Sequence, residues 1–149
     1  MKKILLGLFA MVFLLTGCDS GYERDDTQGE IIEISLSDMK TMMEEGKEFV
    51  VAFTQSSCGY CMEFHAMFNE YAKDHHVVIY EVPLEKEEAS PRENRALIQT
   101  YFPAFDTTPG IFYAKDKTCV DQISNTNITE ELFDNWIQKH ELDKKKSEK

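Results

Sequence analysis

The stretch that decides the fold is FVVAFTQSSCGYC, residues 49–61. Its first part, Phe49–Thr54, is apolar up to its last residue and consists mainly of β-branched and aromatic types. Such a run is typical of a strand that is covered on both faces. A short polar turn follows, and an amphipathic stretch begins at Cys58. The sequence therefore predicts a buried strand, a turn and a helix that starts at a C-x-x-C motif.

Two cysteines at the start of a helix have a chemical use. Cys58 would lie near unsatisfied backbone N–H groups and the positive end of the helix dipole, which favour the thiolate over the thiol. Cys61 follows one helical turn later, close enough to form a disulfide with Cys58 and to resolve a mixed disulfide. The motif predicts Cys58 as the attacking nucleophile and Cys61 as the resolving thiol. Their own redox-active disulfide replaces any cofactor, and we expect no prosthetic group.

The segments on either side alternate between strand-like and helix-like patterns. In addition to 49–54, we expect strands at 31–34, 77–82, 111–114 and 119–123. Four helices are expected, and their starting residues are Ser37, Cys58, Ser90-Pro91 and Thr129. The order β-α-β-α-β-α-β-β-α predicts an α/β domain with a central mixed sheet of four to five strands, flanked by helices.

A second motif, Thr107-Thr108-Pro109, stands about fifty residues after the cysteines and just before a strand. Together with C-G-Y-C after a buried strand, it resembles the thioredoxin fold over nearly all of residues 31–142. In that family the proline is cis, faces the active-site disulfide, and leaves the preceding backbone free to pair with an extended substrate peptide. The resemblance therefore implies that Thr108 and Pro109 form part of a substrate groove.

The dipeptide between the cysteines allows a finer comparison. Gly59-Tyr60 matches the C-G-Y-C motif of disulfide isomerases of the DsbC type, and we expect both residues beside the substrate, with Tyr60 on the exposed rim. The chain also resembles small Gram-positive thioredoxin-like lipoproteins and bacteriocin-transport accessory proteins. It departs from thioredoxins at two positions, with Ala52 in place of a buried acid and Ser57 in place of Trp. Proton transfer to and from Cys61 must therefore differ or be slower.

Residues 1–17 have the pattern of a secretory signal peptide. Two lysines precede the apolar run Ile4–Leu15. A helix of that length rises about 18 Å, well short of the roughly 30 Å hydrocarbon core of a bilayer. The sequence LLTGC, residues 14–18, resembles the bacterial lipobox, in which the signal is cut before a cysteine that then carries lipid. We therefore expect lipidation of Cys18.

Four parts of the chain follow from these patterns. They are the signal peptide at 1–17, lipidated Cys18 with a flexible polar tether at 18–30, a thioredoxin-like domain at 31–142, and a fraying charged tail at 143–149. A protein anchored in this way would work on the extracytoplasmic face of the cell membrane, and we favour a Gram-positive surface. Its expected partners are the thiols and disulfides of other proteins, together with a membrane redox partner.

Length and charge limit the alternatives. The chain has 149 residues, of which 42% are hydrophobic, so it is long enough for one ordinary globular domain. Its net charge of -11 repels phosphate backbones. This acidity excludes a general role in binding nucleic acid.

Several other interpretations of the same residues stay open. A copper or zinc site could use Cys58, Cys61, Met62 and His65, as in a metallochaperone, but there is no second C-x-x-C and Met62 points about 100° away around the helix. A permanently closed structural disulfide, or a non-catalytic accessory module, is also compatible with the motif. We interpret His65 as a packing residue rather than one that tunes the thiols, and Cys119 as a small buried hydrophobe.

Overall fold

Strand β2 (Phe49–Thr54) has the predicted bounds and lies at the centre of the sheet. It belongs to a computed structural model that describes residues 22–123 and 126–146. All of its side chains are buried, and they alternate between two apolar cores. Val50 and Ala52 face one core, whereas Phe49, Val51 and Phe53 face the other. The strand is thus covered on both faces, as its unbroken apolar sequence predicts.

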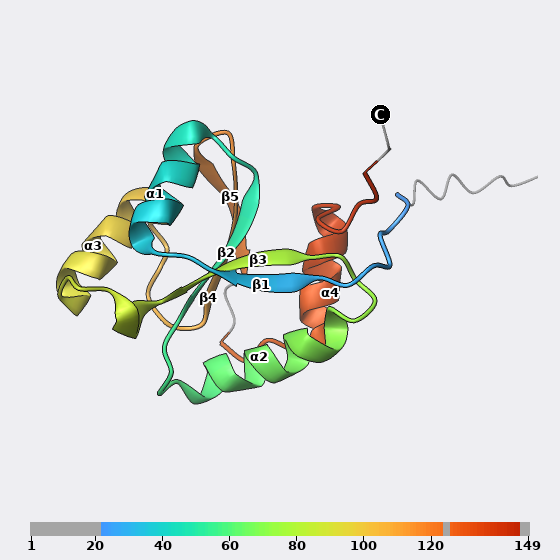
Figure 1. Ribbon diagram of the computed structural model, residues 1–149, viewed down its shortest axis with the longest axis horizontal. Coiled ribbons are helices and arrows are strands. Elements are labelled where there is room, and N and C mark those ends of the chain that lie inside the picture. The colour runs from blue at the N-terminus through green and yellow to red at the C-terminus, as the bar shows by residue number, and fades with distance from the viewer. Residues whose placement is uncertain (1–21, 124–125, 147–149) are drawn as a thin grey trace, which may run out of the picture.

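The predicted mixed sheet has five strands in the order β1-β3-β2-β4-β5 (Figure 1). β1 pairs with β3 and β3 with β2 in parallel, whereas β2 pairs with β4 and β4 with β5 antiparallel. A two-residue turn of Asp116 and Lys117, both at positive φ, joins the last pair of strands. The bounds of the other strands are β1 (Glu30–Glu33), β3 (Val78–Pro83), β4 (Gly110–Lys115) and β5 (Thr118–Ile123).

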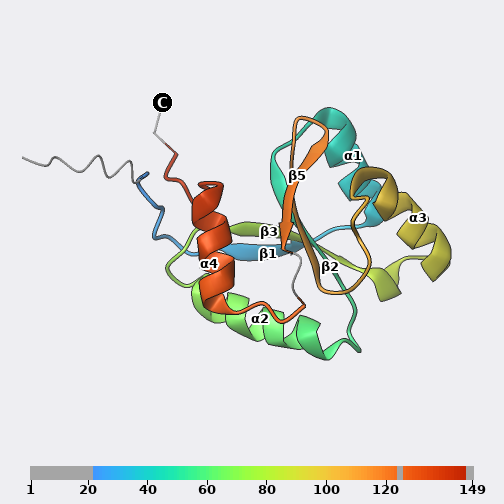
Figure 2. The ribbon, with the colours of Figure 1, turned by 180° about the vertical axis from the view of Figure 1, so that it is seen from behind.

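Helices cover both faces of this sheet. They are α1 (Leu36–Glu45), α2 (Gly59–Tyr71), α3 (Pro91–Tyr101) and α4 (Glu130–Lys139), and a short 3-10 helix, η1 (Leu84–Lys86), follows β3. Helices α1 and α3 lie on one side, and α2 and α4 lie on the other (Figures 1 and 2). The core beneath α2 and α4 includes Phe64, Phe68, Ile111, Phe133 and Ile137, and the core beneath α1 and α3 includes Met39, Phe53, Ile98, Phe102 and Phe112.

The start of α1 differs from the prediction. Ser35, not Ser37, is the N-cap, because its side chain accepts the backbone N–H of Asp38 while the Asp38 carboxylate accepts the N–H of Ser35. This reciprocal capping box satisfies two backbone donors, which Ser37 in the first turn does not do. The starts predicted for the other helices are confirmed, with N-caps at Cys58, Ser90 and Thr129.

The residues before β1 lie against the domain. Arg24 bridges two carboxylates, with Nε 2.6 Å from Asp143 and a second ion pair to Asp134. The hydroxyl of Tyr22 also donates to Asp143, whose side chain is fully buried. Backbone hydrogen bonds and an isolated bridge between Arg24 and Lys144 connect the same two segments.

The boundaries predicted at both ends of the domain therefore need correction. Residues 22–29 are not a free tether, and Asp143 does not belong to a fraying tail, because long-range ion pairs hold them together. The segment before β1 also runs close to the chain at Val77, since a Cβ atom at Gly29 would collide with the Val77 backbone. The predicted signal peptide and Cys18 lie outside the described residues. Within the described residues, no helix is both long and apolar enough to cross a membrane.

Candidate active site

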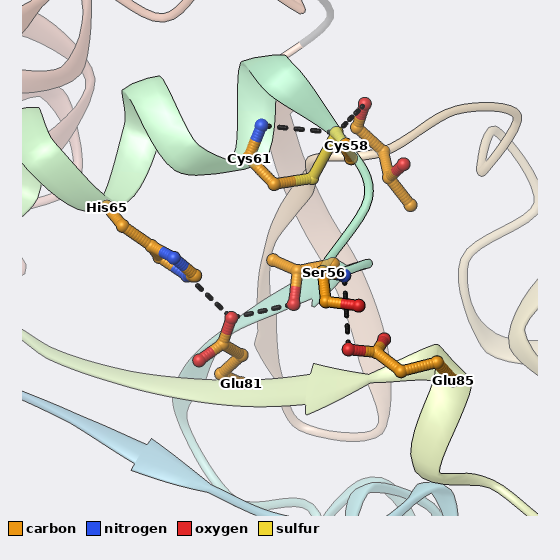
Figure 3. Close-up of a disulfide and its surroundings, with 8 residues drawn as sticks. Ser56, Cys58, Cys61, His65, Glu81 and Glu85 are labelled. Carbon is orange, nitrogen blue, oxygen red and sulfur yellow. Dashed lines mark hydrogen bonds and ion pairs between the residues drawn. A yellow bond between two sulfur atoms is a disulfide. The ribbon is translucent and has the colours of Figure 1, made fainter.

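Cys58 and Cys61 form a disulfide at the start of α2 (Figure 3). Their Cα atoms are 5.2 Å apart, and Cys58 is the N-cap residue of the helix, with extended backbone angles. The backbone N–H of Cys61 donates to Cys58 Sγ over 3.1 Å. This sulfur therefore receives a hydrogen bond from the helix N-terminus, where the helix dipole also favours negative charge. Once the disulfide opens, both effects stabilise a thiolate at Cys58.

The two sulfur-bearing residues differ in access. Cys58 is half-buried, whereas Cys61 is 1% exposed and faces inward from the first turn of α2. A macromolecular substrate can reach only Cys58. The roles predicted from the sequence, in which Cys58 attacks and Cys61 resolves, require such an asymmetry and stay a prediction.

The segment before β4 lies directly against the disulfide. The Thr108–Pro109 peptide bond is cis, as the family resemblance implies, and the Thr108 carbonyl oxygen is 3.4 Å from Cys58 Sγ. Pro109 is buried and Thr108 is half-buried. The fold thus brings together two motifs that lie 50 residues apart in the sequence.

Gly110 is a structural residue of this site that the sequence analysis missed. It begins β4 immediately after Pro109, and a Cβ atom there would lie 2.9 Å from Phe105 Cδ2 and 3.1 Å from Phe112 Cε2. A side chain would push these rings away from the segment that carries Thr108. The only signal in the sequence is a glycine directly after the proline that precedes a strand.

The residues between the cysteines lie on the surface. Tyr60 is 49% exposed, and Gly59 is exposed with open space where a Cβ atom would be. Tyr60 is therefore exposed, as expected, and its place beside a substrate stays a prediction. Met62, one of the methionines expected in the core from their helical spacing, is instead 59% exposed, and it lies on another side of the helix from Tyr60.

A polar cluster lies on the inner side of α2, one turn beyond Cys61. His65 Nε2 is 2.6 Å from Glu81 Oε1, and Thr54 Oγ1 donates to the same oxygen over 2.6 Å (Figure 3). The hydrogen bond with Glu81 raises the pKa of His65 above its ordinary value. Burial raises the pKa of Glu81, but the hydrogen bonds from His65 and Thr54 outweigh burial and hold it below its ordinary value. The expectation that His65 serves mainly for packing overlooked this partner, and it missed Glu81 and Thr54.

A cavity of about 390 Å³ connects this cluster with the disulfide. Cys61, His65 and Glu81 all line it, and the loop before Cys58 forms part of its wall. The backbone N–H of Ser56 in that loop donates to Glu85 Oε1 over 3.0 Å. Because Glu85 belongs to η1, this short helix helps to hold the loop that precedes the disulfide. The cavity beside Cys61 is therefore lined largely by polar side chains, whereas the rest of the α2 interface is an apolar core.

The remaining cysteine within the described residues, Cys119, lies apart from this chemistry. It is half-buried in β5 and packs against the core beneath α1 and α3, so the predicted packing role is confirmed in part. Burial and the nearby Asp121 carboxylate raise the pKa of its thiol, which lowers its reactivity. Among residues 22–123 and 126–146, no three His, Cys, Asp or Glu side chains are grouped as a metal site would require.

The architecture is similar to that of known proteins. Residues 36–140 match the family described as a thioredoxin-like domain. No curated protein matched the chain. Solved structures that match include thioredoxin O1 from Arabidopsis thaliana in its oxidised state, at 16% identity and a TM-score of 0.53 over 76% of this chain and 98% of that one.

Two further thioredoxins have similar folds. The thioredoxin of Malassezia sympodialis is 17% identical, with a TM-score of 0.56 over 76% of this chain and 93% of that one. The reduced Schistosoma mansoni thioredoxin preprotein is 20% identical, with a TM-score of 0.53 over 74% of this chain and 98% of that one. Likeness at these identities shows the fold alone. Because the family match spans most of its length, the chain belongs to the thioredoxin-like domain family.

Proposed function

We propose that the protein is a thiol-disulfide oxidoreductase that exchanges disulfides with other proteins through Cys58 and Cys61. The observation that carries this proposal is the disulfide at the N-terminus of α2, with a half-buried Cys58 beside a cis Thr108–Pro109 bond. The geometry supports the chemistry because an accessible sulfur at a helix N-terminus is stabilised as a thiolate. A buried cysteine within disulfide distance can then complete the exchange.

The reaction needs only these two residues and the substrate. In the reducing direction, the Cys58 thiolate attacks a substrate disulfide, forms a mixed disulfide and releases one substrate sulfur as a thiolate. Cys61 then attacks Cys58, which closes the Cys58–Cys61 disulfide and releases the second substrate sulfur. The oxidising direction is the reverse sequence. Isomerisation begins with the same first step. A different substrate thiolate then attacks the mixed disulfide, forms a new substrate disulfide and releases the Cys58 thiolate, so the enzyme ends as it began. We include it because C-G-Y-C is shared with isomerases of the DsbC type.

We propose an extended segment of polypeptide as the substrate class. The segment would pair with the backbone at Thr108 and lie beside Tyr60. Support comes from the half-buried Thr108, whose carbonyl oxygen is 3.4 Å from Cys58 Sγ, and from the side chain of Tyr60, which is 49% exposed between the two cysteines.

A redox titration tests the proposed activity and its direction. The chain would carry Cys18→Ser and Cys119→Ala so that Cys58 and Cys61 are its only thiols, and it would be equilibrated with glutathione buffers. We expect a reversible two-electron transition and disulfide exchange with a scrambled protein substrate. A potential near about -120 mV indicates an oxidase or isomerase, and one near about -270 mV indicates a reductase. If no disulfide forms at any buffer ratio, the proposal is wrong.

We also propose that lipid on Cys18 anchors the protein to the extracytoplasmic face of a membrane, as the LLTGC sequence indicates. Two acyl chains on one residue are sufficient for stable anchoring. In a bacterium that processes lipoprotein signal peptides, we expect the wild-type chain to sediment with membranes. The Cys18→Ser chain should become largely soluble or remain as uncleaved precursor. Labelling with radioactive palmitate should disappear in the same variant. Membrane retention of a cleaved, unlabelled Cys18→Ser chain would contradict this proposal.

A further inference from the structure

Closure of the Cys58–Cys61 disulfide requires that Cys61 first lose its proton, because the thiolate is the attacking species. Cys61 is 1% exposed, and burial disfavours a charged sulfur. The central strand offers no base, since none of the residues that β2 directs toward this face, Val50, Ala52 and Thr54, has a titratable side chain. A nearby base would therefore speed the step, and the polar cluster beside Cys61 is the place to look for it.

Strand β3 supplies a carboxylate at the level of Ala52. Glu81 is the register partner of Ala52, and partners on neighbouring strands direct their side chains to the same face of the sheet. This arrangement turns Glu81 toward α2, where it meets His65 (Figure 3). Cys61, His65 and Glu81 then border one cavity. Side chains from α2 and β3 thus lie together beside Cys61.

The hydrogen bonds define the state of the histidine. A carboxylate only accepts hydrogen bonds, so His65 Nε2 donates to Glu81 Oε1, and the neutral ring keeps Nδ1 as an acceptor. Thr54 donates to the same Oε1 and holds the carboxylate in place. The side chain of His65 is 37% exposed, so its ring can exchange a proton with solvent. A carboxylate-backed imidazole of this kind is suited to proton transfer near neutral pH.

We propose that His65, held by Glu81, exchanges the proton of the Cys61 thiol when the disulfide opens and closes, an inference that rests on the proposed thiol-disulfide activity. During closure the neutral imidazole takes the proton of Cys61, and the thiolate attacks the Cys58 sulfur of the mixed disulfide. The new Cys58–Cys61 bond forms, the bond from Cys58 to the substrate breaks, and the substrate sulfur leaves with the electron pair. The imidazolium returns its proton to solvent. The enzyme dithiol loses two electrons and the substrate disulfide gains them.

The other charged groups around the cavity do not take this role. Glu33 from β1 and Glu85 and Lys86 from η1 also line it. Lys86 pairs with Glu33 at 2.6 Å, and Glu85 accepts the Ser56 N–H. The hydrogen bond from His65 goes to Glu81, so removal of Glu81 and removal of Glu33 should have different consequences.

A rapid-mixing experiment separates the two cysteines. The full chain with Cys18→Ser and Cys119→Ala, purified in mild detergent and fully reduced, is mixed with excess 5,5′-dithiobis(2-nitrobenzoate). The first release of thionitrobenzoate reports attack by Cys58 and depends on reagent concentration. The second release reports attack by Cys61 on the mixed disulfide and does not. The rate of each phase is recorded from about pH 5 to about pH 9, the range in which a histidine titrates.

We expect the second phase to carry an inflection from His65, which must be neutral to accept the proton. His65→Gln should remove this inflection and slow the second phase by about tenfold at neutral pH. Glu81→Gln should move the inflection to lower pH, because the imidazolium loses the carboxylate whose hydrogen bond raises the pKa of His65. The first phase should change little in either variant, which also shows that the fold is intact.

Glu33→Gln is the matched control, because it removes one carboxylate from the same cavity without touching His65. Its second phase should keep the wild-type inflection. The inference is wrong if His65→Gln and Glu81→Gln leave the pH profile of the second phase unchanged, or if Glu33→Gln shifts it equally. Absence of any second phase in the chain with intact His65 and Glu81 has a different meaning, since it would contradict the thiol-disulfide activity itself.

Discussion

Replacement of Cys58 by Ser is expected to reduce disulfide exchange with a protein substrate to the uncatalysed rate, a loss of about a hundredfold or more. The reason is access, since Cys58 is half-buried at the helix N-terminus whereas Cys61 is 1% exposed and cannot meet a macromolecular disulfide. A serine hydroxyl at the same N-cap would preserve the helix start but does not form a disulfide. The measurement is the rate of insulin reduction by a dithiol in the presence of each variant.

Two further variants make this result specific. Cys61→Ser should keep the first attack but fail to release the substrate, so a mixed disulfide at Cys58 should accumulate and appear on a non-reducing gel. Cys119→Ala should retain wild-type activity, because Cys119 lies in β5, outside the disulfide. Full activity in Cys58→Ser would show that another group performs the chemistry and would refute the assignment of the nucleophile.

The second large effect is expected on stability, from Arg24→Ala. Arg24 and the Tyr22 hydroxyl both contact the Asp143 carboxylate, whose side chain is fully buried. The change removes the first of these two contacts and leaves the second. Loss of one member of a buried ion pair strands the other charge, so we expect the free energy of unfolding to fall by about 3 kcal/mol. Chemical denaturation followed by circular dichroism measures this change. The midpoint should shift while the denaturant slope stays constant, since the unfolded surface is nearly the same.

Lys145→Ala is the control for this prediction. Lys145 pairs with Glu23 in the same two segments, but both side chains are largely exposed, at 56% and 74%. Ion pairs of that kind contribute little because water screens them, so the variant should unfold close to the wild-type midpoint. Equal effects of Arg24→Ala and Lys145→Ala would contradict the view that burial of Asp143 makes the Arg24 contact important.

Several features of the site could be predicted because they depend on short stretches of chain. The apolar run of β2, the turn and the two cysteines are consecutive, and the helix dipole acts on whichever residue begins the helix. The segment at Thr108–Pro109 required the family resemblance as well, since a cis bond has no local pattern of its own. The roles that we propose for Cys58 and Cys61 rest on these features together with their different exposure.

The polar cluster could not be predicted in this way. Glu81 meets Thr54 and His65 only because β3 pairs with β2 in one particular register, and a slip of one residue would turn the carboxylate to the opposite face. The sequence shows a histidine on the same helix face as Cys61 but not the strand that faces it. For that reason the sequence alone favours a packing role for His65.

What the sequence alone determined is the order of elements, the α/β class, the redox motif and the helix starts at Cys58, Ser90 and Thr129, all of which rest on interactions within a few residues. The tertiary structure decided the partner of His65 and the attachment of Arg24 to Asp143, a contact between residues 119 positions apart. Contacts of that range depend on how the sheet and helices pack, because charge and hydropathy patterns along the chain do not specify which distant side chain will neutralise a buried group.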